Sequence, residues 1–366
     1  MHTPLQIVVI RDPRDRRIDV YVDTLRLAFE GSAGAAGSPS AYLDDAVDLG
    51  IRVLEPKKGL RELEAKRLVE GAHHTIVVVI GGACDRSNLL QRMVNSDNLV
   101  HVDAPPKTKS GKVQGDKATD GAEPAFAPVV TALRTMQQAR RALARDAENS
   151  QPAEGHLKLF ISHAKIDGVA MAKSLIGVLR QLREVDGEKS GFAYFYDDEH
   201  LPPGILWREV LKAEAAQSVL IALRTEAYES RYWCRREFLW AESNGMPILT
   251  VDLRKEQYHE SALLPFDLVP TVRVHDGNLI RVVLHAMAAH LRVLRVQRGA
   301  PADVKVLSHR PSVYSLDGAN QAAGVTRKIA YPGPRLPRAY IQAVEPILTQ
   351  GRHRLDLVTF DELGDS

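Results

Sequence analysis

The sequence contains very little cysteine and no long hydrophobic run. Its 366 residues include two cysteines, Cys84 and Cys234, which are too few for a disulfide framework or, by themselves, for a four-ligand zinc site. No stretch approaches the roughly 18 apolar residues of a membrane span, and Met1 to Arg11 lacks the basic-then-apolar order of a signal peptide. We therefore expect a cytoplasmic protein with no membrane partner.

The sequence also lacks an excess of charge of one sign. Forty-eight Lys and Arg against 46 Asp and Glu leave a formal charge of +2, so nothing in the charge balance indicates nucleic acid as a partner. There is no Walker A motif, no G-x-G-x-x-G after a strand and no H-E-x-x-H. The composition, 45% hydrophobic and 26% charged, is that of an ordinary globular chain, and the length predicts two or three domains.

Residues 1–146 are predicted to form an α/β domain. Three apolar runs separated by helical patterns predict strands of a parallel sheet, and they are Leu5–Ile10, Thr75–Ile80 and Leu99–Val102. Residues 104–125 are rich in Pro, Lys, Gly, Asp and Thr, which predicts a polar loop within this domain, and residues 147–155 form a polar linker. We expect the domain to sense a signal or to bind a regulatory partner.

Residues 156–298 alternate strand and helix patterns in the manner of a flavodoxin-like domain with five parallel strands. The predicted strands are 156–162, 192–196, 218–223, 247–251 and 271–274. Residues 299–366 read as a Gly- and Pro-rich tail with a short strand, helix and strand near 328–331, 339–348 and 355–360. This tail is too short to stand alone, so we expect it to pack on a neighbour.

Glu237 stands out on the helix predicted from Trp233 to Ser243. With about 100° per residue, the glutamate falls in the middle of the apolar arc that also includes Cys234, whereas Arg235, Arg236 and Glu242 lie away from that arc. An ionised carboxylate buried there is costly, so it must find a partner or line a cavity. From this geometry alone, a structural glutamate and a functional one remain equally open.

Three motifs of the second domain occur in order along the chain. Phe160-Ile-Ser-His163 closes the first strand, Tyr196-Asp-Asp-Glu-His-Leu-Pro-Pro-Gly204 follows the second, and Ser230-Arg-Tyr-Trp-Cys-Arg-Arg-Glu237 opens the helix with the glutamate. Together they resemble the bacterial Toll/interleukin-1 receptor (TIR) domain over residues 156–298. The resemblance implies the flavodoxin-like TIR fold for this part of the chain.

The resemblance also implies an activity. In the enzymatic TIR domains the glutamate matched by Glu237 cleaves the bond between nicotinamide and ribose in NAD+, which is a substrate and not a cofactor. The products are nicotinamide and ADP-ribose or a cyclic variant. The resemblance further implies a homo-oligomer or filament that assembles through the TIR domain and acts in bacterial anti-phage immunity.

Further residues are candidates for NAD+ contacts, each with a structural alternative. Phe160, Ser162 and His163 come at the carboxyl end of a strand, where doubly wound folds bind ligands, although His163 is equally well explained as an exposed polar residue. Asp198 lies in the loop after the second strand; for Asp197 or Asp198 the alternative is a turn or a cap of the helix at Trp207.

The remaining candidates are Trp207, Ser230, Trp233 and Cys234. The two tryptophans could stack on a nucleotide ring, but Trp207 is more simply a core residue. Ser230 could bind a ribose hydroxyl, and the commoner role of such a serine is to cap the next helix. Cys234 has no histidine near it in sequence, so packing explains it better than a nucleophilic role.

Two other functions remain open: a non-catalytic TIR scaffold in which Glu237 is structural, and a TIR enzyme with another nucleotide product. The first domain is also a candidate for a degenerate copy of the second. An offset of 143 positions aligns Thr75–Ile80 with residues 218–223 and Val94 with Glu237, and with gaps Tyr42–Asp45 and Gly50 match the Tyr196 motif and Gly204. The competing explanation is that any two α/β domains share such spacing.

Overall fold

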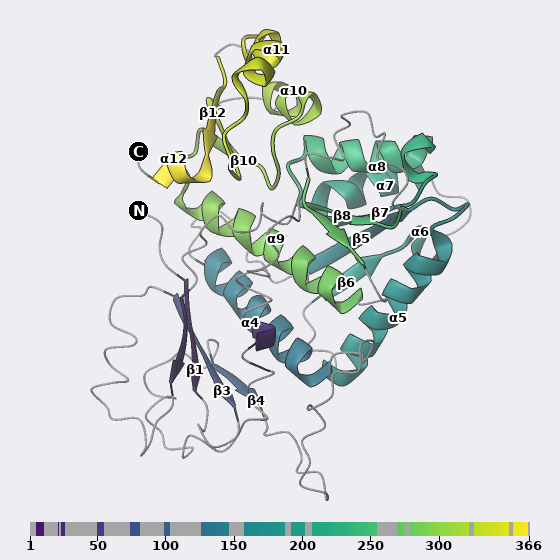
Figure 1. Ribbon diagram of the computed structural model, residues 1–366, viewed down its shortest axis with the longest axis vertical. Coiled ribbons are helices and arrows are strands. Elements are labelled where there is room, and N and C mark those ends of the chain that lie inside the picture. Colours follow the sequence, from purple (N-terminus) through teal and green to yellow (C-terminus); the bar gives the residue numbers. More distant parts are fainter. Residues whose placement is uncertain are drawn as a thin grey trace, which may run out of the picture.

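In the computed structural model the described residues form three parallel sheets with helices around them (Figure 1). The structure describes residues 5–10, 21, 23–25, 50–54, 74–80, 99–102, 126–145, 157–186, 192–201, 207–254, 269–274, 279–321, 326–350 and 354–364. The predicted loop 104–125, the linker 147–155, residues 42–45 and 202–204, and the position of Val94 lie outside these residues.

The central sheet confirms the five parallel strands predicted for the second domain. Its strands are β5 (Leu157–His163), β6 (Phe192–Phe195), β7 (Val219–Arg224), β8 (Ile248–Asp252) and β9 (Thr271–Arg273). Their order is β6-β5-β7-β8-β9, all parallel, which is the order of flavodoxin-like doubly wound sheets. The order reverses between β5 and β7, so their carboxyl ends form the edge where such folds bind ligands.

Helices cover both faces of this sheet. The helices are α5 (Val169–Asp186), α6 (Asp197–His200), α7 (Trp207–Gln217), α8 (Tyr232–Ser243) and α9 (Leu279–Gly299), with a 3-10 turn, η6, at Tyr228–Ser230. The helices α5 and α9 share one apolar core with the sheet, and α7 and α8 share the other. Because β7 is buried along its whole length, its sequence is continuously apolar up to the terminal arginine.

The first domain contains a four-stranded parallel sheet with the order β2-β1-β3-β4. Its strands are β1 (Leu5–Ile10), β2 (Gly50–Leu54), β3 (His74–Ile80) and β4 (Leu99–Val102). The sequence predicted three of these strands and missed β2. Gly50 begins β2, and the ungapped offset of 143 places it on Ala193 of β6, whereas Gly204 lies outside the described residues.

The helix α4 (Phe126–Arg145) lies between the two sheets (Figure 1). It packs on β3 and β4 on one side and on α5 and α9 on the other. Nearly all described side chains of its middle are buried, including Leu133 and Met136. Polar groups in this helix are satisfied locally, since the Thr135 hydroxyl donates to the Thr131 carbonyl at 2.8 Å and Arg140 Nε donates to Gln137 Oε1 at 3.1 Å.

The C-terminal residues form a larger unit than the predicted strand, helix and strand. A parallel sheet of order β10-β11-β12 is built from β10 (Val304–Val306), β11 (Lys328–Tyr331) and β12 (Asp356–Thr359), with helices α10 (Val313–Gln321), α11 (Arg338–Leu348) and α12 (Phe360–Gly364). As expected, this unit packs on a neighbour: α10 contacts α8, and β10 contacts α9.

None of the described helices combines the length and the apolar composition that crossing a membrane requires.

Candidate active site

Glu237 lies on α8 beside the carboxyl end of β5, and its side chain is 7% exposed. The prediction that this glutamate is buried on the apolar face of its helix is therefore confirmed. Its carboxylate Oε2 accepts a hydrogen bond of 2.5 Å from the Ser162 hydroxyl. Ser162 is one residue from the end of β5 and is 1% exposed, so the site lies at the ligand-binding edge of the sheet.

A buried tyrosine completes this arrangement. The Tyr228 hydroxyl lies 2.7 Å from the Ser162 hydroxyl oxygen, and burial, with Cys234 and Glu237 nearby, raises the pKa of Tyr228 well above its usual value. Tyr228 therefore keeps its proton and donates a hydrogen bond to the Ser162 oxygen. The Ser162 hydroxyl in turn donates its hydrogen bond to Glu237. The spacing along the chain gave no signal for Tyr228, because it reaches Ser162 across two neighbouring strands.

The pKa of Glu237 is raised to about 8, and burial is the largest cause. The Ser162 hydrogen bond lowers this pKa, Asp197 raises it and Lys165 lowers it. Without a ligand the carboxyl group is thus mostly protonated at neutral pH. A cation brought next to it would favour the carboxylate, which is the property that a site for a positively charged substrate needs.

His163, Lys165 and Asp197 lie next to this carboxyl group, at the carboxyl ends of β5 and β6. Lys165 Nζ is 3.1 Å from one Asp197 oxygen, and His163 Nδ1 is 4.0 Å from the other. The alternative that made His163 an exposed residue is wrong: it is 7% exposed, and its ring packs against Tyr196 at 5.2 Å. Asp197 begins the short helix α6 and faces the site, while the side chain of Asp198 lies outside the described part.

Asp167 connects the loop after β5 to the loop after β7. Its two carboxylate oxygens accept hydrogen bonds from the Thr225 hydroxyl at 2.7 Å and from the Ala227 amide at 3.0 Å. Because Ala227 directly precedes Tyr228, this contact helps to fix the tyrosine that reaches Ser162. The loops on the two sides of the switch point are therefore held together beside Glu237.

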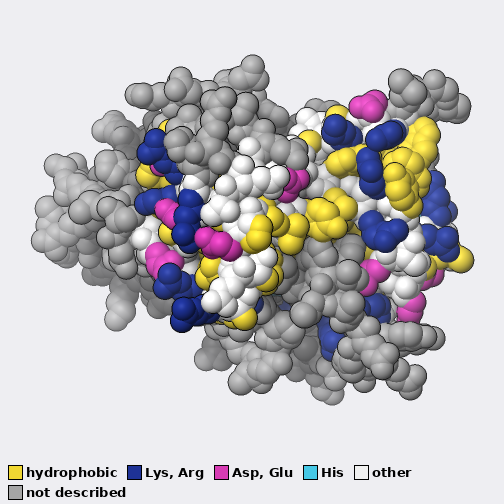
Figure 2. Space-filling model, turned by 90° about the horizontal axis from the view of Figure 1, so that it is seen from above, with side chains coloured by type: hydrophobic (Ala, Val, Ile, Leu, Met, Phe, Trp, Pro, Cys, Tyr) yellow, Lys and Arg dark blue, Asp and Glu magenta, His cyan; other side chains and the backbone are white. Residues whose placement is uncertain are grey.

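An exposed aromatic cluster lies on α7 and α8. The Trp207 and Trp233 ring centroids are 4.1 Å apart, and those of Tyr232 and Trp233 are 4.9 Å apart. Trp207 is 42% and Tyr232 53% exposed, so the expectation that Trp207 is a core residue is wrong. The Arg236 guanidinium lies over the Tyr232 ring, and the face seen from above shows hydrophobic side chains next to Lys and Arg where α7 and α8 lie (Figure 2).

Three other predicted site residues have structural roles. Phe160 is 1% exposed and packs edge to face on Phe195 at 5.1 Å, so its ring is part of the core below the site. Cys234 is buried, donates its thiol proton to the His163 carbonyl at 3.3 Å and has its pKa raised to about 12 by burial and Glu237, which leaves it unreactive. The exposed Ser230 hydroxyl donates to the Ala227 carbonyl at 2.7 Å and does not cap α8.

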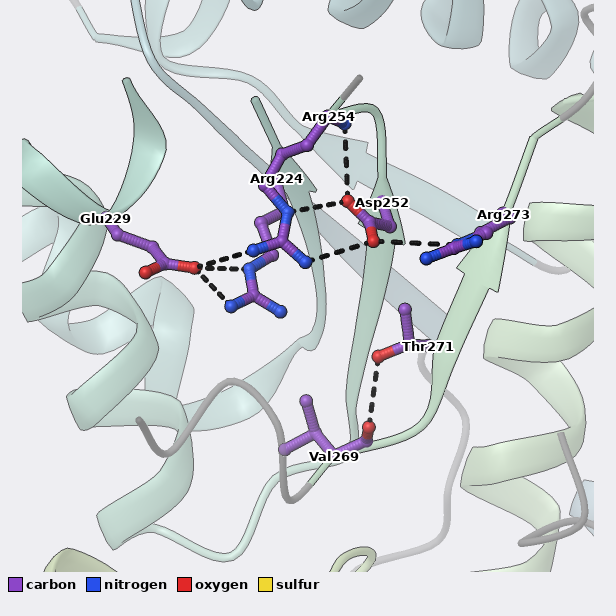
Figure 3. Close-up of polar contacts among 7 residues, drawn as sticks. All are labelled: Arg224, Glu229, Asp252, Arg254, Val269, Thr271 and Arg273. Atoms are coloured by element: carbon purple, nitrogen blue, oxygen red, sulfur yellow. Dashed lines mark hydrogen bonds and ion pairs between the residues drawn. The ribbon is translucent and has the colours of Figure 1, made fainter. Parts of the chain in front are cut away.

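A network of arginines and carboxylates that the sequence did not reveal follows β7, β8 and β9 (Figure 3). Arg224, 2% exposed at the end of β7, pairs with Glu229 of η6. Arg254 binds Asp252 through two hydrogen bonds of 2.8 and 3.1 Å, and Arg273 Nε lies 3.8 Å from the same carboxylate. Although burial raises the pKa of Asp252, the Arg254 hydrogen bonds outweigh this effect and lower it. Glu229 directly follows Tyr228, so the network fixes that loop.

No group of His, Cys, Asp and Glu among the described residues could hold a metal ion. The chemistry available at the site is thus that of a buried carboxyl group, two hydroxyls and a lysine–aspartate pair. No protein-family model matches the chain, and no curated protein matches it.

Proposed function

We propose that this chain is a TIR-domain NAD+ glycohydrolase that cleaves the nicotinamide–ribose bond and releases nicotinamide and ADP-ribose or a cyclic variant. The observation that carries the proposal is Glu237, a buried carboxyl group at the switch point of the sheet that Ser162 and Tyr228 hold in one orientation. The three TIR-like sequence motifs converge there, since Ser162, Asp197 and Glu237 come from different motifs and meet at one edge.

The chemistry needs little more than a carboxylate. Nicotinamide is bound to ribose as a cation and leaves as a neutral molecule, so its departure requires no general acid. The positive charge that develops on the ribose is stabilised by the buried Glu237 carboxylate. Water then bonds to that ribose carbon and loses a proton to give ADP-ribose, or another atom of the same molecule bonds there to give the cyclic variant. The positive charge of the bound substrate would also favour ionisation of Glu237, whose pKa burial raises to about 8.

The aromatic and basic surface near Glu237 is suited to a dinucleotide. Trp207 and Trp233 offer ring faces and edges on which a flat heterocycle can pack. Arg231, which is exposed directly before the helix that carries Glu237, can attract a diphosphate. Both features support a phosphate-bearing substrate with aromatic bases.

The rest of the proposal concerns the assembly. We expect TIR domains of several copies to associate and thereby activate the enzyme in defence against phages. The first domain shares the strand order of the first four strands of the central sheet, but the 143-residue offset places Val94 where the second domain has Glu237. A domain without this carboxylate fits a regulatory or partner-binding role.

The test is nicotinamide release from NAD+ by the full chain at high protein concentration, compared between wild type and Glu237→Gln. We expect the variant to lose at least ~100-fold in kcat, the scale of removing one electrostatic stabiliser of a transition state. Glu209→Gln, which changes an exposed glutamate of α7, is the matched control and should retain the wild-type rate. Equal rates for wild type and Glu237→Gln would refute the assignment.

A non-catalytic TIR scaffold is the second candidate, and the exposed Trp207 and Tyr232 support it because large exposed aromatics also mark protein-binding surfaces. In that case Glu237 is a protonated structural residue, and no condition of assembly produces nicotinamide. A TIR enzyme with another product, such as a cyclic ADP-ribose isomer or a cyclic nucleotide made from nucleic acid, is distinguished by chromatography of the products.

A further inference from the structure

The C-terminal unit, residues 304–364, has a hydrophobic core of its own and lies against the end of α8 (Figure 1). That end is a Schellman motif: the Met246 amide donates to the Ala241 carbonyl at 2.9 Å, the Gly245 amide donates to the Glu242 carbonyl at 2.9 Å, and Gly245 has φ of 70°. The motif turns the chain away from the helix and leaves the Ser243 and Met246 carbonyls facing the C-terminal unit.

The C-terminal unit binds these two carbonyl groups. Lys305 Nζ donates to the Ser243 carbonyl at 3.1 Å, and the Ser308 hydroxyl donates to the Met246 carbonyl at 3.3 Å. A cation at the carboxyl end of a helix also interacts favourably with the helix dipole. Gly318 of α10 packs so closely that a Cβ atom there would lie 2.6 Å from the Ser243 carbonyl oxygen.

A buried carboxyl group lies inside this contact. Glu242 of α8 is 0% exposed, and among the described residues neither of its oxygens meets a donor at hydrogen-bond geometry. Burial raises its pKa to about 7, and the Ser312 hydroxyl, which does not reach hydrogen-bond geometry with either oxygen, opposes this rise without cancelling it. Because an ionised carboxylate in such a place is costly, the contact is weakened when Glu242 loses its proton.

Burial also shifts the pKa of other titratable groups in this contact. Burial and Glu242 raise the pKa of Tyr340 on α11, and burial lowers that of Lys305 on β10. The pKa of His309, between β10 and α10, is lowered to about 4 by burial. The pKa of Glu242, about 7, places the change of its charge between pH 6 and 8.

The contact and the candidate active site share one helix. Glu237 precedes Glu242 by five residues, and its hydrogen bond to Ser162 is 2.5 Å long. A helix moves as a rigid rod over such a distance, so a shift of its carboxyl end displaces the Glu237 carboxyl group from Ser162. Displacements of about 1 Å are enough to cost a reaction ~100-fold.

We propose that the C-terminal unit is a clamp on α8 that positions Glu237 against Ser162, and that the charge on Glu242 loosens this clamp. The effect on catalysis rests on the proposed function, whereas the effect on α8 does not. Residues 304–364 then belong to the catalytic unit, and any partner that displaces them acts on the site without touching it.

The test compares two glycine substitutions in the full-length protein. Gly318→Ala inserts a methyl group between α10 and Ser243, while Gly177→Ala adds one to α5 where nothing lies within 4 Å. Amide hydrogen exchange of α8 should become at least ~10-fold faster in Gly318→Ala and remain unchanged in Gly177→Ala. Nicotinamide release should fall in kcat in the first variant alone, with little change in KM.

Unchanged exchange in α8 of Gly318→Ala would overturn the clamp, whatever the activity. If α8 exchanges faster but the wild type releases no nicotinamide, the clamp is supported and the proposed function fails.

Glu242→Gln is the second variant, because it keeps the shape of the side chain and removes the charge. The measured exchange rates are first corrected for the intrinsic pH dependence of amide exchange. The protection of the α8 amides should then decline between pH 6 and 8 in the wild type but not in Glu242→Gln. The same decline in both proteins would contradict the role of Glu242.

Discussion

At the scale of single residues, the site depends on how three hydroxyl and carboxyl groups share protons. Tyr228 donates to Ser162, and Ser162 donates to Glu237, whose pKa burial raises to about 8. Only the carboxylate form can stabilise a cationic ribose, and kcat/KM reports the ionisation of the free enzyme. We therefore expect kcat/KM for NAD+ to rise about tenfold per pH unit below pH 8 and to level off above it, which a pH profile of initial rates measures.

The hydrogen-bond donors to Glu237 determine the pH midpoint of this kcat/KM profile. Ser162→Ala removes the hydrogen bond that lowers the Glu237 pKa, and hydrogen bonds to charged groups contribute about 1.5–3 kcal/mol. The midpoint of the profile should move up by roughly one to two pH units. Tyr228→Phe should shift it in the same direction by less, since it acts through Ser162. The control Tyr194→Phe removes a phenol that bonds Arg180 and Glu199, and a shift in the control would contradict this interpretation.

At the scale of elements, periodicity predicted the helices that bury one face and the central strands that are buried on both faces. The central strands and α5, α8 and α9 have continuous or 3.6-residue apolar patterns, and the structure confirms each of them. Periodicity failed where a second surface docks. Glu242 lies away from the apolar arc of α8, and the C-terminal unit nevertheless buries it there. The helix α10 was missed because its sequence contains Ser, Asp, Gly and Asn, which are poor helix formers.

The helix α4 also shows that periodicity does not reveal which elements a helix packs against. The helical pattern of residues 128–146 predicts a helix at the end of the first domain, and no pattern could show that it also packs on α5 and α9. Leu133, 2% exposed, belongs to the core it shares with the central sheet. Leu133→Ala should lower the free energy of unfolding by about 2–5 kcal/mol and move a single denaturant transition, whereas the half-buried Gln138→Ala should change it by less than about 0.5 kcal/mol. Two separate transitions would show that α4 does not couple the sheets.

At the scale of the whole molecule, buried titratable groups of both signs set the pH range of stability. Burial lowers the pKa of His285, His290 and His309 to about 4, from an ordinary 6.5. It raises the pKa of Glu242 to about 7 and that of Glu237 to about 8, from 4.5. Below pH 6.5 the unfolded chain takes up protons at the three histidines that the folded protein excludes, so these groups make stability rise with pH.

The two glutamates act in the opposite direction, because the folded protein holds their protons up to pH 7 and 8 while the unfolded chain loses them near pH 4.5. Their contribution to stability is complete below about pH 4.5 and disappears as the pH rises through 7 and 8. The free energy of unfolding should therefore be greatest near pH 6 to 6.5 and decline by up to about 1.4 kcal/mol per pH unit for each glutamate that titrates. Urea denaturation from pH 5 to 9 measures this curve. Glu242→Gln should flatten the decline above pH 6.5, and an identical decline in the variant would show that Glu242 does not titrate there.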